Sequence, residues 1–289
     1  ALFKLLRDLK IDNKLCWVKT KMGFYYQGKL FEWGSVSGLL KFLCVGIFFV
    51  VWTHPVAGDE LEPRITEGMV LIPGGTFKRG CDNFGPQHGA PEQKVHLDAF
   101  WIDKFEITNK KFEKLFSEHY LRRSIFSDCD DCPVSKINWY EAADYCHLIG
   151  KSLPSEAHWE RAASNGDGCQ FPWGDGFDLM SPLARGGLKL RDKATEVGSF
   201  PANSSGVYDM AGNVWEWVAD WFSVKFYYTD ILHNPRGPTR GVMKVRRGGS
   251  WSDSVVAMTS GYRDWSYPLS RGFNDIGFRC AINLKPKRD

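Results

Sequence analysis

Cysteines are the residues whose type and spacing could most directly do chemistry in this chain. Cys129 and Cys132 are separated by two residues, a spacing that suits a disulfide, a redox centre or half of a zinc site. The chain has no second pair of this kind and no histidine at zinc-finger spacing, so we expect a structural disulfide. The same part of the chain also holds Cys81, Cys146, Cys169 and Cys280. An even number of cysteines favours disulfides in an oxidising compartment, and six cysteines allow fifteen pairings.

Hard oxygen ligands gather in the stretch Asp209–Trp217, which reads DMAGNVWEW. It offers carboxylates, an amide and loop carbonyls within a few residues, and calcium binds several oxygens of this kind at about 2.3–2.6 Å. The alternative is that Asn213 and Glu216 only satisfy buried backbone donors. Histidine provides no comparable centre, because the seven histidines show no HxxxH spacing. We expect each of them at the surface or in a satisfied core position.

These side chains must be positioned by a fold rich in loops and aromatic rings. The 289 residues are 43% hydrophobic and 15% aromatic, with 29 glycines and 12 tryptophans, which excludes a disordered chain and argues against a helical bundle. We predict strand, turn and strand over residues 69–77 and a half-buried strand over 95–106. Periodicity and capping residues predict three helices. They begin at Thr108 or Asn109, span Trp139–Leu148, and run from a cap at Ser155 to Ala163.

Basic charge is concentrated at the N-terminal end of the chain. Residues 1–57 carry 8 Lys and Arg against 3 Asp and Glu, and the remainder carries 29 against 31. This asymmetry indicates membrane contact and gives the main domain no nucleic-acid footprint. Residues 34–56 contain one charged side chain, Lys41, and are long enough to span a bilayer as a helix. We expect an uncleaved transmembrane signal anchor there; the alternative is a cleavable signal peptide with an unusual extension.

The domain organisation follows from this anchor. Residues 1–33 form a basic segment that the positive-inside rule places in the cytoplasm. Within it, the spacing of basic and apolar residues over 1–14 predicts an amphipathic helix that lies on anionic lipid or on a partner. The alternative is a plain solvated helix. Residues 57–67 are an acidic and polar linker. Residues 68–289 form one domain outside the cytoplasm, which is the periplasm in a bacterium.

Eight motifs of the main domain occur in the order of a known family. They are MVLIPGGTF (69–77), EITN (106–109), LPSEAHWE (153–160), FPWG (171–174), YDMAGNVWEW (208–217), NPRGP (234–238), RGGSW (247–251) and IGFRCA (276–281). Together they resemble the formylglycine-generating enzyme family, also called the sulfatase-modifying factor family, over about residues 68–283. The resemblance implies an α+β fold related to C-type lectins, with little regular secondary structure.

The resemblance also implies site residues. One structural Ca²⁺ would take the Glu216 carboxylate as a ligand. The loop around it would add backbone carbonyls from Ala211, Gly212 and Val214. The amide side chain of Asn213 would help to shape that loop. A second calcium site of the family falls in residues 183–192 and is not expected, because an arginine stands where a ligand belongs. Cys146 and Cys280 match a family disulfide.

The segment after Trp251 departs from the family. Catalytic members carry two cysteines five residues apart there, which bind copper(I) and activate O₂ to oxidise a substrate cysteine to formylglycine. Here Ser252 and Asp253 stand at the first position and Ala257 and Met258 at the second. Hydroxyl and carboxylate groups do not hold copper(I), which needs soft sulfur ligands. Copper-dependent oxidation is therefore not expected.

A remnant of the catalytic cleft is expected near this segment. Its candidate lining residues are Ser252, Asp253, Tyr262, Arg263 and Trp265. For Tyr262, Arg263 and Trp265 the alternative is structural stacking under the last loop.

The sequence thus predicts a membrane-anchored, non-catalytic module that acts as a binding, scaffolding or accessory subunit of a membrane protein complex. Its partners would be membrane lipid and other subunits of the complex, with no nucleic acid, and the sequence leaves a small-molecule substrate unknown. The alternative is an oxidoreductase or protein-modifying enzyme of the same family with a non-standard active site. A free thiol of low pKa at Cys129 or Cys132 would favour that alternative.

Overall fold

The computed structural model describes residues 65–85, 87–164, 169–174 and 192–284, together with three short strands near the N-terminus. The chain divides into two compact units, Ala1–Glu62 and Pro63–Asp289. In the first unit, an antiparallel sheet of order β1-β2-β3 is formed by β1 (Cys16–Val18), β2 (Gly23–Tyr26) and β3 (Lys29–Glu32). This sheet was not expected from the sequence.

The membrane-related predictions fall elsewhere in the first 64 residues. The basic repeat in residues 1–14 and the expected anchor at 34–56 lie outside the described residues. Among the helices that the structure describes, none is long and apolar enough to cross a membrane.

The described part of the second unit contains small sheets joined by long irregular segments. One sheet has the order β10-β9-β8-β11, another has β12-β7-β4, and β5 pairs with β6. The strands are β4 (Met69–Ile72), β5 (Gly75–Arg79), β6 (Gln93–Leu97), β7 (Phe100–Asp103), β8 (Trp215–Trp221), β9 (Lys244–Arg247), β10 (Arg263–Ser266), β11 (Ile276–Gly277) and β12 (Ala281–Asn283). The helices are α4 (Asn109–Glu113), η2 (Ser117–Arg122), α5 (Trp139–Leu148), α6 (Glu156–Ala163), η4 (Val224–Tyr228) and η5 (Val255–Met258).

The three predicted helices are confirmed, and side chains cap each of them. The Thr108 hydroxyl accepts a hydrogen bond from the Lys111 backbone nitrogen at the start of α4. Asn138 and Glu141 form a reciprocal capping box at the start of α5. Ser155 caps α6 in the same way as Thr108 caps α4. Each cap satisfies a backbone N–H that the helix itself leaves without a partner.

The strand, turn and strand predicted over residues 69–77 are confirmed as β4 and β5. The two strands do not form a hairpin, because β4 pairs with β7 and β5 with β6. The single strand expected over 95–106 was wrong in detail, because Asp98 and Ala99 lie outside regular structure and divide it into β6 and β7. This break packs closely on Gly74, where an added Cβ would lie 2.9 Å from the Ala99 nitrogen.

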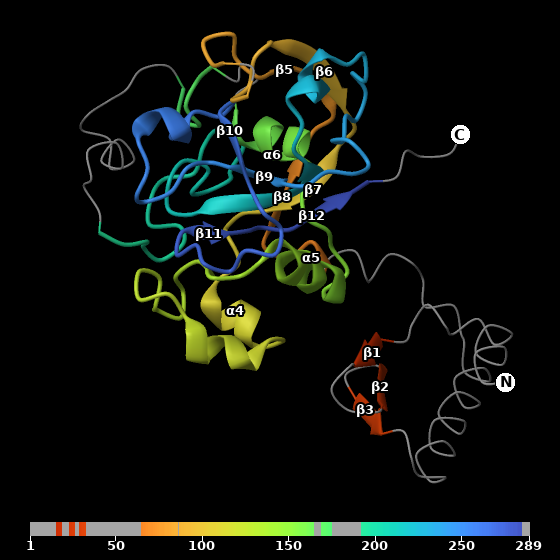
Figure 1. Cartoon of the computed structure of the whole chain (residues 1–289), viewed down its shortest axis with the longest axis vertical. Coiled ribbons are helices and arrows are strands. Elements are labelled where there is room, and N and C mark those ends of the chain that lie inside the picture. The colour runs from red at the N-terminus through yellow and green to blue at the C-terminus, as the bar shows by residue number, and fades with distance from the viewer. Residues whose placement is uncertain are drawn as a thin grey trace, which may run out of the picture. The chain divides into compact units, whose positions relative to one another are not determined.

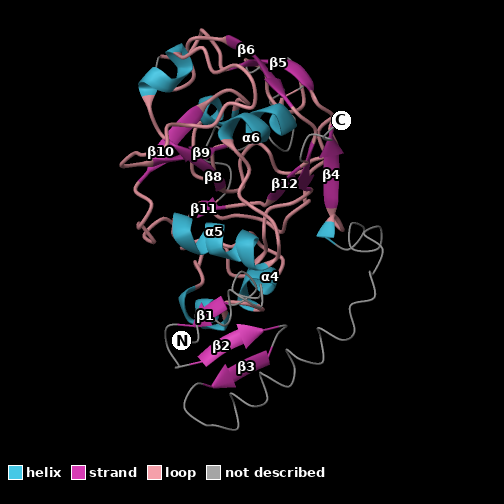
Figure 2. Cartoon of the chain, turned by 90° about the vertical axis from the view of Figure 1, so that its right-hand side faces the viewer, coloured by secondary structure: helices cyan, strands magenta, loops and turns pink. Residues whose placement is uncertain are grey.

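The core is divided by β8, which is buried on both faces. Trp215 and Trp217 belong to a cluster with residues of α5, whereas Val218 belongs to a cluster with Trp159 of α6. α6 accordingly lies on one side of the β8–β9 pair and α5 and α4 on the other (Figures 1 and 2). This arrangement places α6 next to the ends of β9 and β10, where the candidate site is built.

Candidate functional site

Helix α6 presents two glutamates on one face. Glu156 and Glu160 are four residues apart, so they lie one above the other along the helix, and both are buried. The Asp220 carboxylate at the end of β8 accepts hydrogen bonds from the Glu156 nitrogen at 2.8 Å and from the Gly237 nitrogen at 2.5 Å. The N-terminus of α6 is therefore fixed both by its own cap and by the central sheet.

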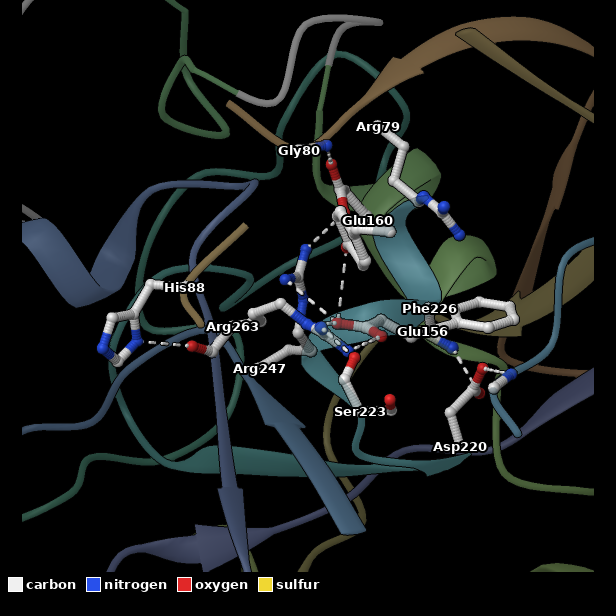
Figure 3. Close-up of polar contacts among 12 residues, drawn as sticks. Arg79, Gly80, His88, Glu156, Glu160, Asp220, Ser223, Phe226, Arg247 and Arg263 are labelled. Carbon is white, nitrogen blue, oxygen red and sulfur yellow. Dashed lines mark hydrogen bonds and ion pairs between the residues drawn. The ribbon is translucent and has the colours of Figure 1, made fainter. Parts of the chain in front are cut away.

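Two buried arginines meet these glutamates. Arg247 ends β9 and Arg263 begins β10, and they are directly opposite each other in the antiparallel pair. Arg263 donates to both oxygens of Glu156 at 2.7 Å. Arg247 donates to Glu160 at 2.6 Å and lies 3.5 Å from Glu156 (Figure 3). Like charges opposite each other destabilise a sheet, and the two carboxylates offset that repulsion here.

The pKa values of the two glutamates are shifted in opposite directions. Burial raises the pKa of Glu156, but the guanidiniums of Arg263 and Arg247 outweigh it and hold this pKa below its ordinary value. At Glu160 burial outweighs the attraction of Arg247, and the pKa is raised. Burial and the nearby charge of Glu156 also raise the pKa of Asp220 to about 6. Because these groups are enclosed, the network supports the site and does not meet solvent.

The loop that joins β9 to β10 carries the hydroxyl and carboxylate groups expected from the sequence. Asp253 Oδ2 accepts hydrogen bonds from Trp215 Nε1 at 2.8 Å and from the Ser250 hydroxyl. The Ser250 hydroxyl also lies 3.1 Å from Asp275 Oδ2, and the Ser252 hydroxyl donates to the same oxygen at 3.3 Å. Two carboxylates thus converge on one serine. Ser252 and Asp253 both contact the Ser250 hydroxyl.

Asp275 and Met258 define the rest of this loop environment. Burial raises the pKa of the Asp275 carboxyl, and hydrogen bonding by Ser250 opposes the shift. Met258 is only 1% exposed and packs against Gly212, where an added Cβ would lie 3.4 Å from the Met258 methyl carbon. Met258 is therefore a core residue, so this position offers no accessible sulfur.

Five rings form a row beside the β9–β10 loop. The His88 ring is stacked between Tyr262 and Trp265, with centroid distances of 4.8 and 5.6 Å. Phe222 stacks on Trp265 at 4.1 Å, and Phe84 meets Tyr262 edge-on at 5.4 Å. All five side chains are partly exposed. We call these five residues the aromatic row, and it contains two of the predicted remnant-site residues.

The prediction that Arg263 lines the same surface was wrong. Its side chain has no solvent exposure and is held by Glu156, because a buried carboxylate needs a paired, hydrogen-bonded cation. From its buried position the Arg263 guanidinium lies 4.8 Å from the ring centroid of Phe222. The Arg263 carbonyl accepts a hydrogen bond from His88 Nδ1 at 3.1 Å (Figure 3).

The loop Asp209–Trp217 holds the expected calcium residues, but several of them have other partners. Both oxygens of Glu216 accept hydrogen bonds from Arg279 at 2.7 Å. The Asn213 amide donates to Glu106 at 2.7 Å and accepts from the Thr195 nitrogen at 3.0 Å. Asn213 therefore shapes the loop. Glu216 does not fit the part of a dedicated calcium ligand, because a guanidinium already occupies its carboxylate.

The charge around this loop nevertheless fits a cation. The carboxyl groups of Glu106, Asp209 and Glu216 surround the single guanidinium of Arg279, and the pKa of Glu106 is raised well above its usual value by burial and then by Asp209 and Glu216. The loop carbonyls of Ala211, Gly212 and Val214 belong to the same buried turn. A divalent cation would neutralise the excess negative charge. The second family site, at residues 183–191, lies outside the described residues.

The six cysteines between residues 65 and 284 all form disulfides. Cys146 is joined to Cys280, the pairing that the resemblance implies, and Cys129 is joined to Cys132. The third disulfide links Cys81 and Cys169. None of these six residues is left as a free thiol.

Sequence reasoning missed the ion-pair network, His88 and Asp275. Glu156 and Glu160 did carry a local signal for an ion-pair network. They are four residues apart in a predicted helix and fall on the face that the hydrophobic pattern predicts to be buried. No local signal marked His88, whose contacts lie 174 and 177 residues away in Tyr262 and Trp265.

Comparison with known proteins agrees with the fold and with the order of motifs. The model of the sulfatase-modifying factor enzyme 1-like domain matches residues 58–284. The serine/threonine-protein kinase Pkn1 of Chlamydia trachomatis is 35% identical over 80% of this chain and 41% of its own length. The chain thus spans about two fifths of such Pkn1 relatives.

Two further similarities cover most of the compared protein. Formylglycine-generating enzyme of Mus musculus is 28% identical over 79% of this chain and 78% of its own length. The solved structure of Treponema denticola variable protein 1 shares the fold, with a TM-score of 0.64 and 24% identity over 75% of this chain and 95% of that one.

Proposed function

This chain belongs to the family of sulfatase-modifying factor enzyme 1-like domains, and from that premise we propose that it is a non-catalytic binding module anchored at a membrane. One observation carries the proposal. Asp253 and Met258, at the positions of the family's copper-binding thiols, are a hydrogen-bonded carboxylate and a buried core residue. Copper(I) would find no soft ligand pair there.

The first experiment tests the loss of the oxidase chemistry. The full-length protein is titrated anaerobically with copper(I) against a chromophoric chelator, and O₂ consumption is followed with a cysteine-containing peptide. We expect no stoichiometric copper(I) binding and no peptide-dependent O₂ uptake. The matched variant D253C/M258C restores two thiols five residues apart and should gain copper(I) affinity. Stoichiometric binding or peptide oxidation by the unmodified protein would overturn the proposal and favour the enzyme alternative.

The aromatic row is the surface that we assign to partner binding. Its rings are partly exposed and rigidly stacked, and aromatic side chains supply contact area at low entropic cost. The carboxylates of Asp253 and Asp275 lie on the adjoining β9–β10 loop and its neighbour. An aromatic floor beside acidic groups suits a protein segment that presents a basic side chain. The partner would then be a protein subunit with such a segment.

A pull-down tests this surface directly. Full-length protein is purified from native membranes in mild detergent, and the co-purifying subunits are identified. Replacing Tyr262 and Trp265 with alanine should release a stoichiometric partner, whereas Y140A on the exposed face of α5 should retain it. A protein that purifies alone, or a partner that survives loss of both rings, would contradict the assignment.

Export of the main domain is supported by its disulfides. Three disulfides within residues 63–289 fit an oxidising compartment, and an anchor at residues 34–56 would hold the domain at the membrane on its non-cytoplasmic side. Protease treatment of intact spheroplasts should remove the domain while leaving cytoplasmic proteins intact. A fully protected domain with reduced cysteines would contradict export.

We also propose one structural Ca²⁺ at the Asp209–Trp217 loop. When bound, the ion would neutralise the carboxylate cluster, with Asp209 and the loop carbonyls of Gly212 and Val214 as the candidate oxygens. Millimolar CaCl₂ should raise the melting temperature, and D209N should remove that increase. An unchanged melting temperature, or an equal increase in D209N, would argue against this site.

A further inference from the structure

A cluster of two histidines and one aspartate lies on the edge of β6, away from the β9–β10 loop. The ligand atoms of His96, Asp98 and His233 all lie within 4.8 Å of one another. Two imidazoles and one carboxylate form a ligand set that zinc uses at sites with an open fourth position. We propose that His96, Asp98 and His233 bind a borderline transition-metal ion such as Zn²⁺.

The backbone brings the two histidines together. His96 and His233 form a parallel bridge, in which the His96 nitrogen donates to the Leu232 carbonyl at 2.7 Å and the Asn234 nitrogen donates to the His96 carbonyl at 2.8 Å. Their rings stack with centroids 5.0 Å apart. The segment around His233 therefore pairs with the edge of β6. Backbone hydrogen bonds, and not side-chain conformation alone, set the distance between the two histidines.

Polar contacts with Asn234 and Thr76 orient two of the three ligands. The Asn234 side chain accepts from the Asp98 nitrogen at 2.9 Å and donates to Asp98 Oδ2 at 2.8 Å. Asp98 Oδ1 is then directed to His233 Nε2 at 3.7 Å. His96 Nδ1 lies 3.3 Å from the Thr76 hydroxyl, which leaves Nε2 for a metal. Partners of this kind fix the tautomer and orientation of ligands in metal sites.

The cluster needs only a small closure to coordinate zinc. Zn–N bonds of about 2.0–2.1 Å place tetrahedral ligand atoms about 3.3 Å apart, compared with the 4.8 Å span of this cluster. His233 Nδ1 lies 3.1 Å from the Asn234 side-chain nitrogen, so a small rotation of the His233 ring would bring Nε2 to the ion. All three ligands are at least partly exposed, so side-chain rotation suffices.

A cavity adjoins the cluster. It has a volume of about 220 Å³, and its lining includes Asp98, Asn234, His158 and Arg236. A water molecule or a small anion in this cavity could complete the coordination, with Arg236 compensating the charge of an anion. Metal binding would also tie the NPRGP motif that follows His233 to β6.

Equilibrium dialysis against ZnCl₂, with metal measured by mass spectrometry, tests the proposal. The full chain is used in the presence of CaCl₂, so that calcium occupies any hard-oxygen site. H96A, D98N and H233A should each bind at this site at least about tenfold more weakly. H147A, which removes an exposed histidine from α5, should bind as the unmodified protein does. Equal zinc stoichiometry and affinity in H96A, H233A and the unmodified protein would overturn the site.

Cobalt provides a second readout that does not depend on stoichiometry. Co²⁺ in a tetrahedral site gives visible d–d absorption, which we expect for the unmodified protein and H147A. The bands should be lost in H233A while the circular dichroism of the metal-free variant remains unchanged. Unchanged d–d bands in H233A would contradict coordination by this trio.

Discussion

Glu156 and Arg263 are 107 residues apart and form a buried two-point ion pair, with Nε–Oε1 and Nη2–Oε2 distances of 2.7 Å. One partner begins α6 and the other begins β10. The pair therefore holds α6 against β10, the strand that carries Trp265 of the aromatic row. Its desolvation is compensated by further bonds, because Arg263 also donates to the Ser223 carbonyl at 3.2 Å and stacks over Tyr227 at 4.3 Å.

Removing Arg263 should destabilise the protein strongly. R263A leaves the Glu156 carboxylate buried without its main partner, which costs about 3–5 kcal/mol. R271A is the matched control, because Arg271 pairs with Glu141 at 3.1 Å at an exposed position and should cost at most about 1 kcal/mol. Urea denaturation measures both free energies of unfolding. Similar values for the two variants would show that the buried pair is not an anchor.

Gly89 should be intolerant of any side chain. Its φ is 131°, and an added Cβ would lie 2.7 Å from the Gly261 carbonyl oxygen. G89A should therefore displace His88 from the aromatic row and destabilise the protein by about 1–3 kcal/mol. G85A in the same loop has open space around the new Cβ and should change stability by less than about 0.5 kcal/mol. Thermal melts compare the two, and equal melting temperatures would refute the steric argument.

The disulfides should differ in their contribution to stability. Cys146–Cys280 spans 134 residues and Cys129–Cys132 spans 3. On the chain-entropy view, losing the long loop costs about 5 kcal/mol and losing the short one about 2 kcal/mol. C146A/C280A should thus unfold at a clearly lower urea concentration than C129A/C132A. The reverse order would mean that the short disulfide supports local structure beyond its loop.

Asp220 should make stability decrease as pH rises through the weakly acidic range. Its pKa of about 6 in the folded protein lies above the ordinary 3.8. Between these values the folded state holds a proton that the unfolded state has lost, so the contribution is full below pH 3.8 and lost above about pH 6. The span corresponds to about 3 kcal/mol.

D220N should make that decrease smaller, because the raised pKa values of Glu106, Glu160 and Asp275 add to it in the same direction. D144N on the exposed face of α5 should retain the full decrease. Free energies of unfolding measured from pH 4 to pH 7 give the slope for each variant. An identical slope in D220N and the unmodified protein would assign the pH dependence to other groups.

Local patterns predicted the helices of this fold better than its strand pairing. Trp139–Leu148 has helical periodicity and a capping asparagine beside it, and these signals act within one turn. The pairing of β4 with β7 depends on where residues 30 positions apart meet, which no local pattern encodes. The positions of Ser252 and Asp253 near the candidate site were predictable, because they directly follow the RGGSW motif. The inward turn of Arg263 was not, because it depends on Glu156 of a distant helix.

The same limit applies to the histidines. His96 and His233 have no sequence spacing that indicates a metal site, yet the edge bridge at β6 places their rings 5.0 Å apart. A ligand set assembled from two segments 137 residues apart is invisible until the edge pairing is known.

Clamping both ends of the β9–β10 loop to a single helix has a consequence for how such a domain can diverge. Arg247 and Arg263 fix the two ends through Glu160 and Glu156, so the strand ends stay attached to α6 whichever side chains the exposed part of the loop carries. Exposed loop positions such as Ser252 can therefore change while the framework stays folded.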